Sequence, residues 1–99
     1  MVKLLMGWNI IPKQEGDYFE FVVREFEPGL QELGLHVTDV WLTVYGEWPQ
    51  IVTGAVSQDL ATVHQVLASD KWRGLKGRLL QYVTNYQQKI VRANGNYQL

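Results

Sequence analysis

The segment from Val2 to Ile11 alternates with a period of two, which is the pattern of a β-strand. Its even-numbered residues form a wholly apolar face, whereas its odd-numbered residues mix apolar and polar side chains. Pro12 then ends the strand because it has no amide hydrogen to donate. This pattern favours a sheet that covers a core with one face and leaves its other face half apolar.

Three further segments are predicted to be extended. Val37–Tyr45 and Gln50–Ser57 are rich in β-branched and aromatic residues, and the turn sequence Gly46-Glu47-Trp48-Pro49 joins them. They predict an antiparallel hairpin. Tyr86–Ala93 alternates again and predicts the last strand.

A helix is predicted between the first two strands. Asp17, after Gly16, is expected to cap its first amides, and Gly34 supplies a left-handed stop. Its inward stripe is predicted to contain Phe19, Val22, Phe26, Leu30 and Leu33. Pro28 lies inside this run, where it lacks a donor and its ring presses on the carbonyl of Arg24. We therefore expect a kink or a break there.

Two shorter helices are predicted after the hairpin. Asp59 is expected to cap the first, and Ser69 or Asp70 to start the second. The inward residues of the first are predicted to be Leu60, Val63 and Leu67. Those of the second are predicted to be Trp72, Leu75, Leu79 and Val83.

Composition narrows the class of protein. The 99 residues predict a single domain over residues 1–95, followed by a short tail at 96–99. The chain has no cysteine, which excludes disulfides and thiolate metal sites and favours a cytoplasmic location. A net charge of −1 gives no electrostatic footprint for nucleic acid or an anionic membrane. No segment has the roughly 20 apolar residues of a membrane span, and the first residues are a poor signal peptide.

Charge is divided unevenly along the chain. Residues 1–59 hold three basic and nine acidic side chains, whereas residues 60–99 hold six and one. The two halves are therefore expected to attract each other, or the opposite half of a second copy.

The predicted order, β-α-β-β-α-α-β, is that of an α+β, ferredoxin-like fold. Right-handed crossovers place the helices on one face of a four-stranded antiparallel sheet and leave the other face bare. The residues predicted to face the helices are Leu4, Met6, Val40, Leu42, Val44, Val52, Val56 and Val91. Those predicted on the bare face are Leu5, Trp41, Tyr45, Ile51, Ala55, Tyr86 and Ile90, with Asn9, Thr43, Thr53, Gln88 and Arg92 among them. So large an apolar face requires a cover, and a second copy of the same sheet is the simplest one, so we expect a homodimer.

Three stretches carry a resemblance to a known family. YFEFVVREFEPGLQELG, VYGEWPQIVTG and LASDKWRGLKGRLL are similar, in this order, to the NIPSNAP-type branch of the dimeric α+β barrel superfamily. A weaker likeness is to the antibiotic-biosynthesis monooxygenases. The resemblance implies two ferredoxin-like sheets paired face to face. It leaves activity open, because the superfamily includes cofactor-free oxygenases, haem-degrading enzymes, isomerases and stress-response proteins.

A ligand-binding site is predicted from residues assigned to the bare face, and the face of the sheet that holds a cavity stays open. Asn9, Trp41, Tyr45, Tyr86 and Arg92 offer stacking surfaces, hydrogen-bond donors and positive charge for a small aromatic molecule. The alternative, which we prefer, is that Trp41, Tyr45 and Tyr86 simply fill the space between two sheets.

Histidines are the candidates for acid or base chemistry. An imidazole can act as a base or as a haem ligand, but neither His36 nor His64 has a second ligand at useful spacing, so both are expected at the surface and no metal site is predicted. Haem-degrading relatives combine an asparagine, a tryptophan and a histidine, a set that Asn9, Trp72 and His64 imitate only by residue type. No cofactor is therefore predicted.

Three classes of function are consistent with the sequence. The preferred one is a NIPSNAP-like barrel that binds a small molecule or acts in a stress response, with no identifiable catalytic set. The enzymatic alternative is a cofactor-free monooxygenase or isomerase acting on a small aromatic or quinone-like substrate. The third is an assembly protein whose barrel is filled by its own side chains.

Overall fold

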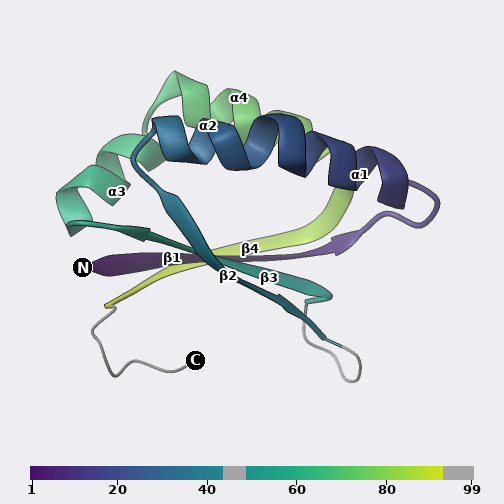
Figure 1. The fold of residues 1–99 in the computed structure, drawn as a ribbon, viewed down its shortest axis with the longest axis horizontal. Coiled ribbons are helices and arrows are strands. Elements are labelled where there is room, and N and C mark those ends of the chain that lie inside the picture. The colour runs from purple at the N-terminus through teal and green to yellow at the C-terminus, as the bar shows by residue number, and fades with distance from the viewer. Residues whose placement is uncertain (44–48, 93–99) are drawn as a thin grey trace.

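The computed structural model describes residues 1–43 and 49–92, and it is a two-layer α+β structure (Figure 1). Its strands are β1 (Val2–Ile10), β2 (His36–Leu42), β3 (Ile51–Ser57) and β4 (Val83–Arg92). Its helices are α1 (Glu15–Phe21), the π-helical segment η1 (Val22–Phe26), α2 (Glu27–Glu32), α3 (Leu60–Leu67) and α4 (Asp70–Leu79). The strands form one sheet in the order β2-β3-β1-β4, and the helices all lie on one side of it. The predicted ferredoxin-like order and the single helical layer are confirmed.

Strand β1 lies inside the sheet, with β3 and β4 antiparallel to it on either side. Opposed residues of paired strands leave the sheet on the same face, so the register fixes which residues share a face. Leu4 is opposite Ala55 on one side and Ile90 on the other, and all three belong to or pack against the core. Leu5 is opposite Gly54 and Lys89, which places those positions on the bare face.

Ten of the predicted face assignments are therefore wrong. Leu4, Met6, Val40 and Leu42 do face the helices, and Leu5 and Trp41 do lie on the bare face. The residues assigned to the bare face that instead face the helices are Ile51, Thr53, Ala55, Tyr86, Gln88, Ile90 and Arg92. The residues assigned to the helices that instead lie on the bare face are Val52, Val56 and Val91. Val44 and Tyr45 lie outside the described residues.

The long helical run is continuous but changes its hydrogen-bond period before Pro28. The amide of Glu27 donates to the carbonyl of Val22, five residues back, which is a π-helical bond. Pro28 is the second residue of α2 and directly follows this π-helical bond, so the π-turn accommodates the position that has no amide donor. The expected break is thus a π-turn in an otherwise unbroken helix.

The π-turn also changes the predicted inward stripe. Phe19 is 54% exposed, whereas Tyr18 and Phe21 are buried. The next buried aromatic residue, Phe26, is five positions after Phe21 instead of the three or four of an α-helix, because the π-turn holds one extra residue. The helix also begins earlier than expected, at Glu15, and Asp17 lies in its first turn without capping it.

The two later helices begin with the predicted caps. The side chain of Asp59 accepts a hydrogen bond from the amide of Thr62 at 2.7 Å, and Ser69 accepts one from the amide of Trp72 at 3.2 Å. Trp72, Leu75, Leu79 and Val83 are buried as predicted. In α3 the buried residues are Val63 and Val66, and the predicted Leu60 is 47% exposed instead. Over the described part of the chain, no helix is long and apolar enough to cross a membrane.

Candidate functional site

A pocket lies between the helical layer and the edge strand β2, and we call it the helix-side pocket. Its volume is about 150 Å³. The sheet contributes Trp8, Val37, Val40, Leu42, Ile51 and Thr53, and the helices contribute Tyr18, Phe19, Val22, Phe26 and Glu27. Val40 and Leu42 are 61% and 68% exposed because the helices leave this edge of the sheet uncovered. The pocket is therefore an apolar space with an open, apolar rim.

Trp8 is the centre of an aromatic cluster at the inner wall of this pocket. Its indole nitrogen donates to the hydroxyl of Tyr18 at 2.9 Å. Its ring meets Phe26 edge-on at 5.9 Å and stacks on Tyr86 at 6.0 Å between ring centroids. The pocket wall is thus held by both a buried hydrogen bond and aromatic packing.

The hydroxyl of Tyr18 is a neutral donor at ordinary pH. Burial raises the pKa of this phenol above its usual value, and the hydrogen bond from Trp8 only partly opposes that rise. The oxygen accepts from Trp8, and its proton has no acceptor within residues 1–43 and 49–92. A bound molecule with an oxygen acceptor would find this proton available.

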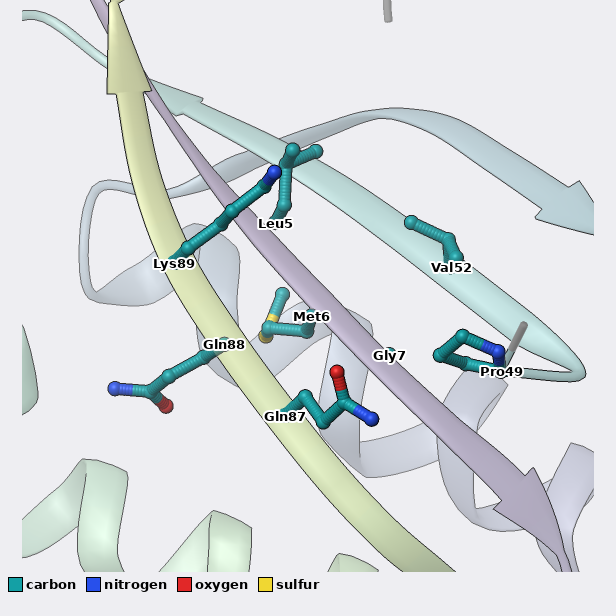
Figure 2. A pocket seen from close by; sticks show the side chains of 8 residues that line it. All are labelled: Leu5, Met6, Gly7, Pro49, Val52, Gln87, Gln88 and Lys89. Carbon is teal, nitrogen blue, oxygen red and sulfur yellow. The ribbon is translucent and has the colours of Figure 1, made fainter. Parts of the chain in front are cut away.

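The second cavity lies on the bare face of the sheet, and we call it the sheet-face hollow (Figure 2). Its volume is about 270 Å³, and its lining is Leu5, Met6, Gly7, Pro49, Val52, Gln87, Gln88 and Lys89. Figure 2 shows Gln87 and Lys89 reaching from β4 toward β1, with Val52 and Pro49 on the other side of that strand. A Cβ atom at Gly7 would lie 3.0 Å from Cγ of Pro49, so a larger residue at that position would crowd this ring.

An ion pair lies on the same face, next to the hollow. Lys3 Nζ donates to a carboxylate oxygen of Asp39 at 2.7 Å, across the glycine at position 54. The hydrogen bond from Lys3, with a smaller contribution from Thr38, lowers the pKa of Asp39 below its usual value. Asp39 lies on the edge strand β2, and Lys3 engages its carboxylate there.

The structure does not bring the predicted ligand-binding residues together. Asn9 and Trp41 are on the bare face, but Asn9 accepts a hydrogen bond from the amide of Gln50 at 2.8 Å. Gln50 in turn accepts from the amide of Ile10 at 2.9 Å. Asn9 therefore fastens β1 to the start of β3. Tyr45 lies outside the described residues.

Tyr86 and Arg92 are on the other side of the sheet. Tyr86 stacks on Trp8 beneath α4, and Lys76 lies over its ring at 4.7 Å from the centroid. Burial raises the pKa of Tyr86 far above its usual value. Arg92 pairs with Val2 at the far end of β1 from Asn9.

The predicted acid or base residues stay apart from both cavities. His36 is exposed at the start of β2, and His64 is exposed on α3. Trp72 is a buried core residue, so the set of Asn9, Trp72 and His64 does not form a site. No group of three or more potential metal ligands occurs among the described residues.

Sheet order, crossover pattern and single helical layer define a ferredoxin-like α+β protein. No protein-family model and no curated protein matches the sequence. An uncharacterised NIPSNAP domain protein from Burkholderia xenovorans is similar in structure, with a TM-score of 0.71, 12% identity and 99% of each chain covered. A protein from Deinococcus radiodurans, described as a putative antibiotic biosynthesis monooxygenase, is also similar, with a TM-score of 0.72 and 16% sequence identity. The match covers 100% of this chain and 98% of that protein's chain.

A third similar structure is that of a protein described as dimeric. It has unknown function and a ferredoxin-like fold, and it comes from Bacteroides fragilis. The TM-score is 0.61 at 13% identity, and the match covers 93% of this chain and 95% of that protein's chain. At such low identities these likenesses establish the fold, which is the one that the resemblance to NIPSNAP proteins and monooxygenases implied.

Proposed function

We propose that this protein is a NIPSNAP-like homodimer that binds a small, mainly apolar molecule in the helix-side pocket. The observation that carries the binding proposal is the lining of this pocket, which is aromatic and aliphatic except for the hydroxyls of Tyr18 and Thr53 and the carboxylate of Glu27. A pocket with few, well-placed polar groups is typical of small-molecule sites. The partly open apolar rim gives such a molecule a route of entry.

Volume and donor chemistry limit the ligand. A cavity of about 150 Å³ lined by apolar side chains accommodates a molecule the size of benzene. The available proton of Tyr18 favours a ligand with one oxygen acceptor, such as an aromatic ketone or a quinone. The described lining offers Glu27 as its one carboxylate and no histidine, so retention of the ligand is proposed and not turnover.

The homodimer is proposed from the bare face of the sheet. Its described apolar residues are Leu5, Trp41, Val52, Val56 and Val91. None of the helices in the described part of the chain covers this face (Figure 1), and two apolar sheets stack face to face about 10 Å apart. The Bacteroides fragilis protein with this fold is described as dimeric, which supports a homodimer.

Calorimetry with acetophenone tests the pocket, with ethylbenzene as the matched molecule that lacks the acceptor. Acetophenone should bind more tightly than ethylbenzene. Val22→Phe fills the pocket and should abolish binding, whereas Val23→Phe makes the same change at an exposed neighbour and should not. Equal binding by both variants would refute the site.

Sedimentation velocity tests the dimer. Val52→Glu places a charge on the bare face and should give monomers, whereas Val23→Glu on the exposed helix surface should leave dimers. Circular dichroism shows whether each variant is folded. A wild-type protein that sediments as a monomer at working concentrations would refute the proposed assembly.

A further inference from the structure

The sheet-face hollow carries two hydrogen-bond donors beside an apolar floor. Lys89 and Gln87 extend from β4 along one side, while Leu5 and Val52 provide aliphatic surface (Figure 2). Lys89 forms no salt bridge with any residue of 1–43 or 49–92. A cation and an amide therefore line the same apolar hollow.

The charges that the described residues place on this face do not balance. By register, the described charged residues of the bare face are Lys3, Asp39 and Lys89. Lys3 and Asp39 neutralise each other through their 2.7 Å contact, which leaves the ammonium of Lys89. Pairing two such faces would enclose one ammonium from each copy that no residue of 1–43 or 49–92 compensates, and an unpaired charge is costly to remove from water.

We propose that the sheet-face hollow binds a small organic acid, whose carboxylate pairs with Lys89 Nζ and the Gln87 amide. The apolar body of the acid lies against Leu5, Val52 and Pro49. This inference rests on the proposed homodimer, because closure of the second sheet removes water from the hollow and strengthens the charge pair. Each dimer would hold two such acids between its sheets, apart from the ligand of the helix-side pocket.

Benzoate is the probe, and benzyl alcohol is the neutral molecule of similar shape. Binding is measured by calorimetry, and the dimer dissociation constant by sedimentation velocity with and without each compound. Benzoate should bind and should tighten the dimer, because a ligand held by the dimer shifts the association equilibrium toward it. Benzyl alcohol should do neither.

Lys89→Met keeps the length of the side chain and removes its charge. It should weaken benzoate binding about tenfold or more, because a hydrogen bond to a charged group is lost. Lys76→Met makes the same change on the helical side and should leave benzoate binding unchanged. The dimer should persist in both variants.

The outcomes separate this inference from the assembly on which it rests. A dimer that ignores benzoate, binds benzyl alcohol equally well or retains full affinity in Lys89→Met overturns the inference alone. Benzoate binding that Val22→Phe abolishes and Lys89→Met preserves places the acid in the helix-side pocket and also overturns it. A monomeric wild-type protein overturns the homodimer and the inference together.

Discussion

Replacing Tyr18 by phenylalanine removes one hydroxyl from the centre of the candidate site. Trp8 and Tyr18 are only 1% and 3% exposed, so the indole N–H loses its acceptor in apolar surroundings. The indole N–H that now donates at 2.9 Å would stay buried without a partner. Leaving a buried donor unsatisfied costs about 1–3 kcal/mol.

Thermal unfolding measures this cost directly. In a domain of this size each kcal/mol lowers Tm by about 4–8 °C. The protein concentration has to be the same for all variants, because subunit association adds to the apparent stability. Tyr82→Phe is the matched control, since the hydroxyl of Tyr82 has no hydrogen-bond partner in the described part of the chain.

The same variant has a functional readout. Tyr18→Phe should weaken binding of acetophenone but not of ethylbenzene, because only the ketone accepts the phenolic proton. If Tyr18→Phe and Tyr82→Phe unfold at the same temperature as the wild type, the buried hydrogen bond contributes nothing and the reasoning fails. If both compounds lose affinity equally, the hydroxyl shapes the pocket without donating to its ligand.

Three further predictions concern stability. In a urea titration, Gly29→Ala should destabilise the protein by about 1–3 kcal/mol, because the new Cβ would lie 2.6 Å from Cδ1 of the buried Leu75. In the same titration Gly77→Ala, which has open space around it, should stabilise α4 by up to about 1 kcal/mol. Ser69→Ala should lower the free energy of unfolding by about 0.5–2 kcal/mol, because it removes the cap of α4. Ser57→Ala should lower it little, because the buried hydroxyl of Ser57 has no hydrogen-bond partner in the described part of the chain. Equal losses of stability in chemical unfolding would contradict this. Above about pH 4, the pKa of an aspartate in the unfolded chain, Asp39→Asn should be less stable than the wild type. This difference in stability should vanish as the pH falls through the lowered folded-state pKa of Asp39. A difference that persists in strong acid would rule out the ion pair with Lys3 as its cause.

The sequence predicted the elements well because their signals are local. Alternation identified β1, and the side chains of Asp59 and Ser69 cap the two later helices at the expected positions. Pro28 marked the place where the α-helical pattern changes. The proline alone could not indicate that a π-turn would absorb the change and bring Tyr18 into the core instead of Phe19.

The candidate site was harder to predict because it depends on which face each strand presents. The strand β3 is apolar at both odd and even positions, from Ile51 to Val56, so its alternation does not identify the buried face. Pairing with β1 decides it: Leu4, which is wholly buried, lies opposite Ala55. The partner strand therefore supplied information that β3 itself lacks.

The position of Tyr86 depends on an irregularity that hydrophobic pattern does not reveal. The register between β1 and β4 shifts after the pair of Gly7 and Gln87 and resumes at Asn9 and Thr84. Asn85 lies in this interval with a positive φ of 56°, a conformation that asparagine adopts more readily than most residues. The extra residue of β4 turns Tyr86 toward the helices, where it stacks on Trp8 behind the helix-side pocket. Thr84 lies on the bare face, so strict alternation from it would place Tyr86 on the bare face and Gln87 on the helical side. The bulge reverses both placements. One bulge thus supplies an aromatic support to one cavity and an amide donor to the other.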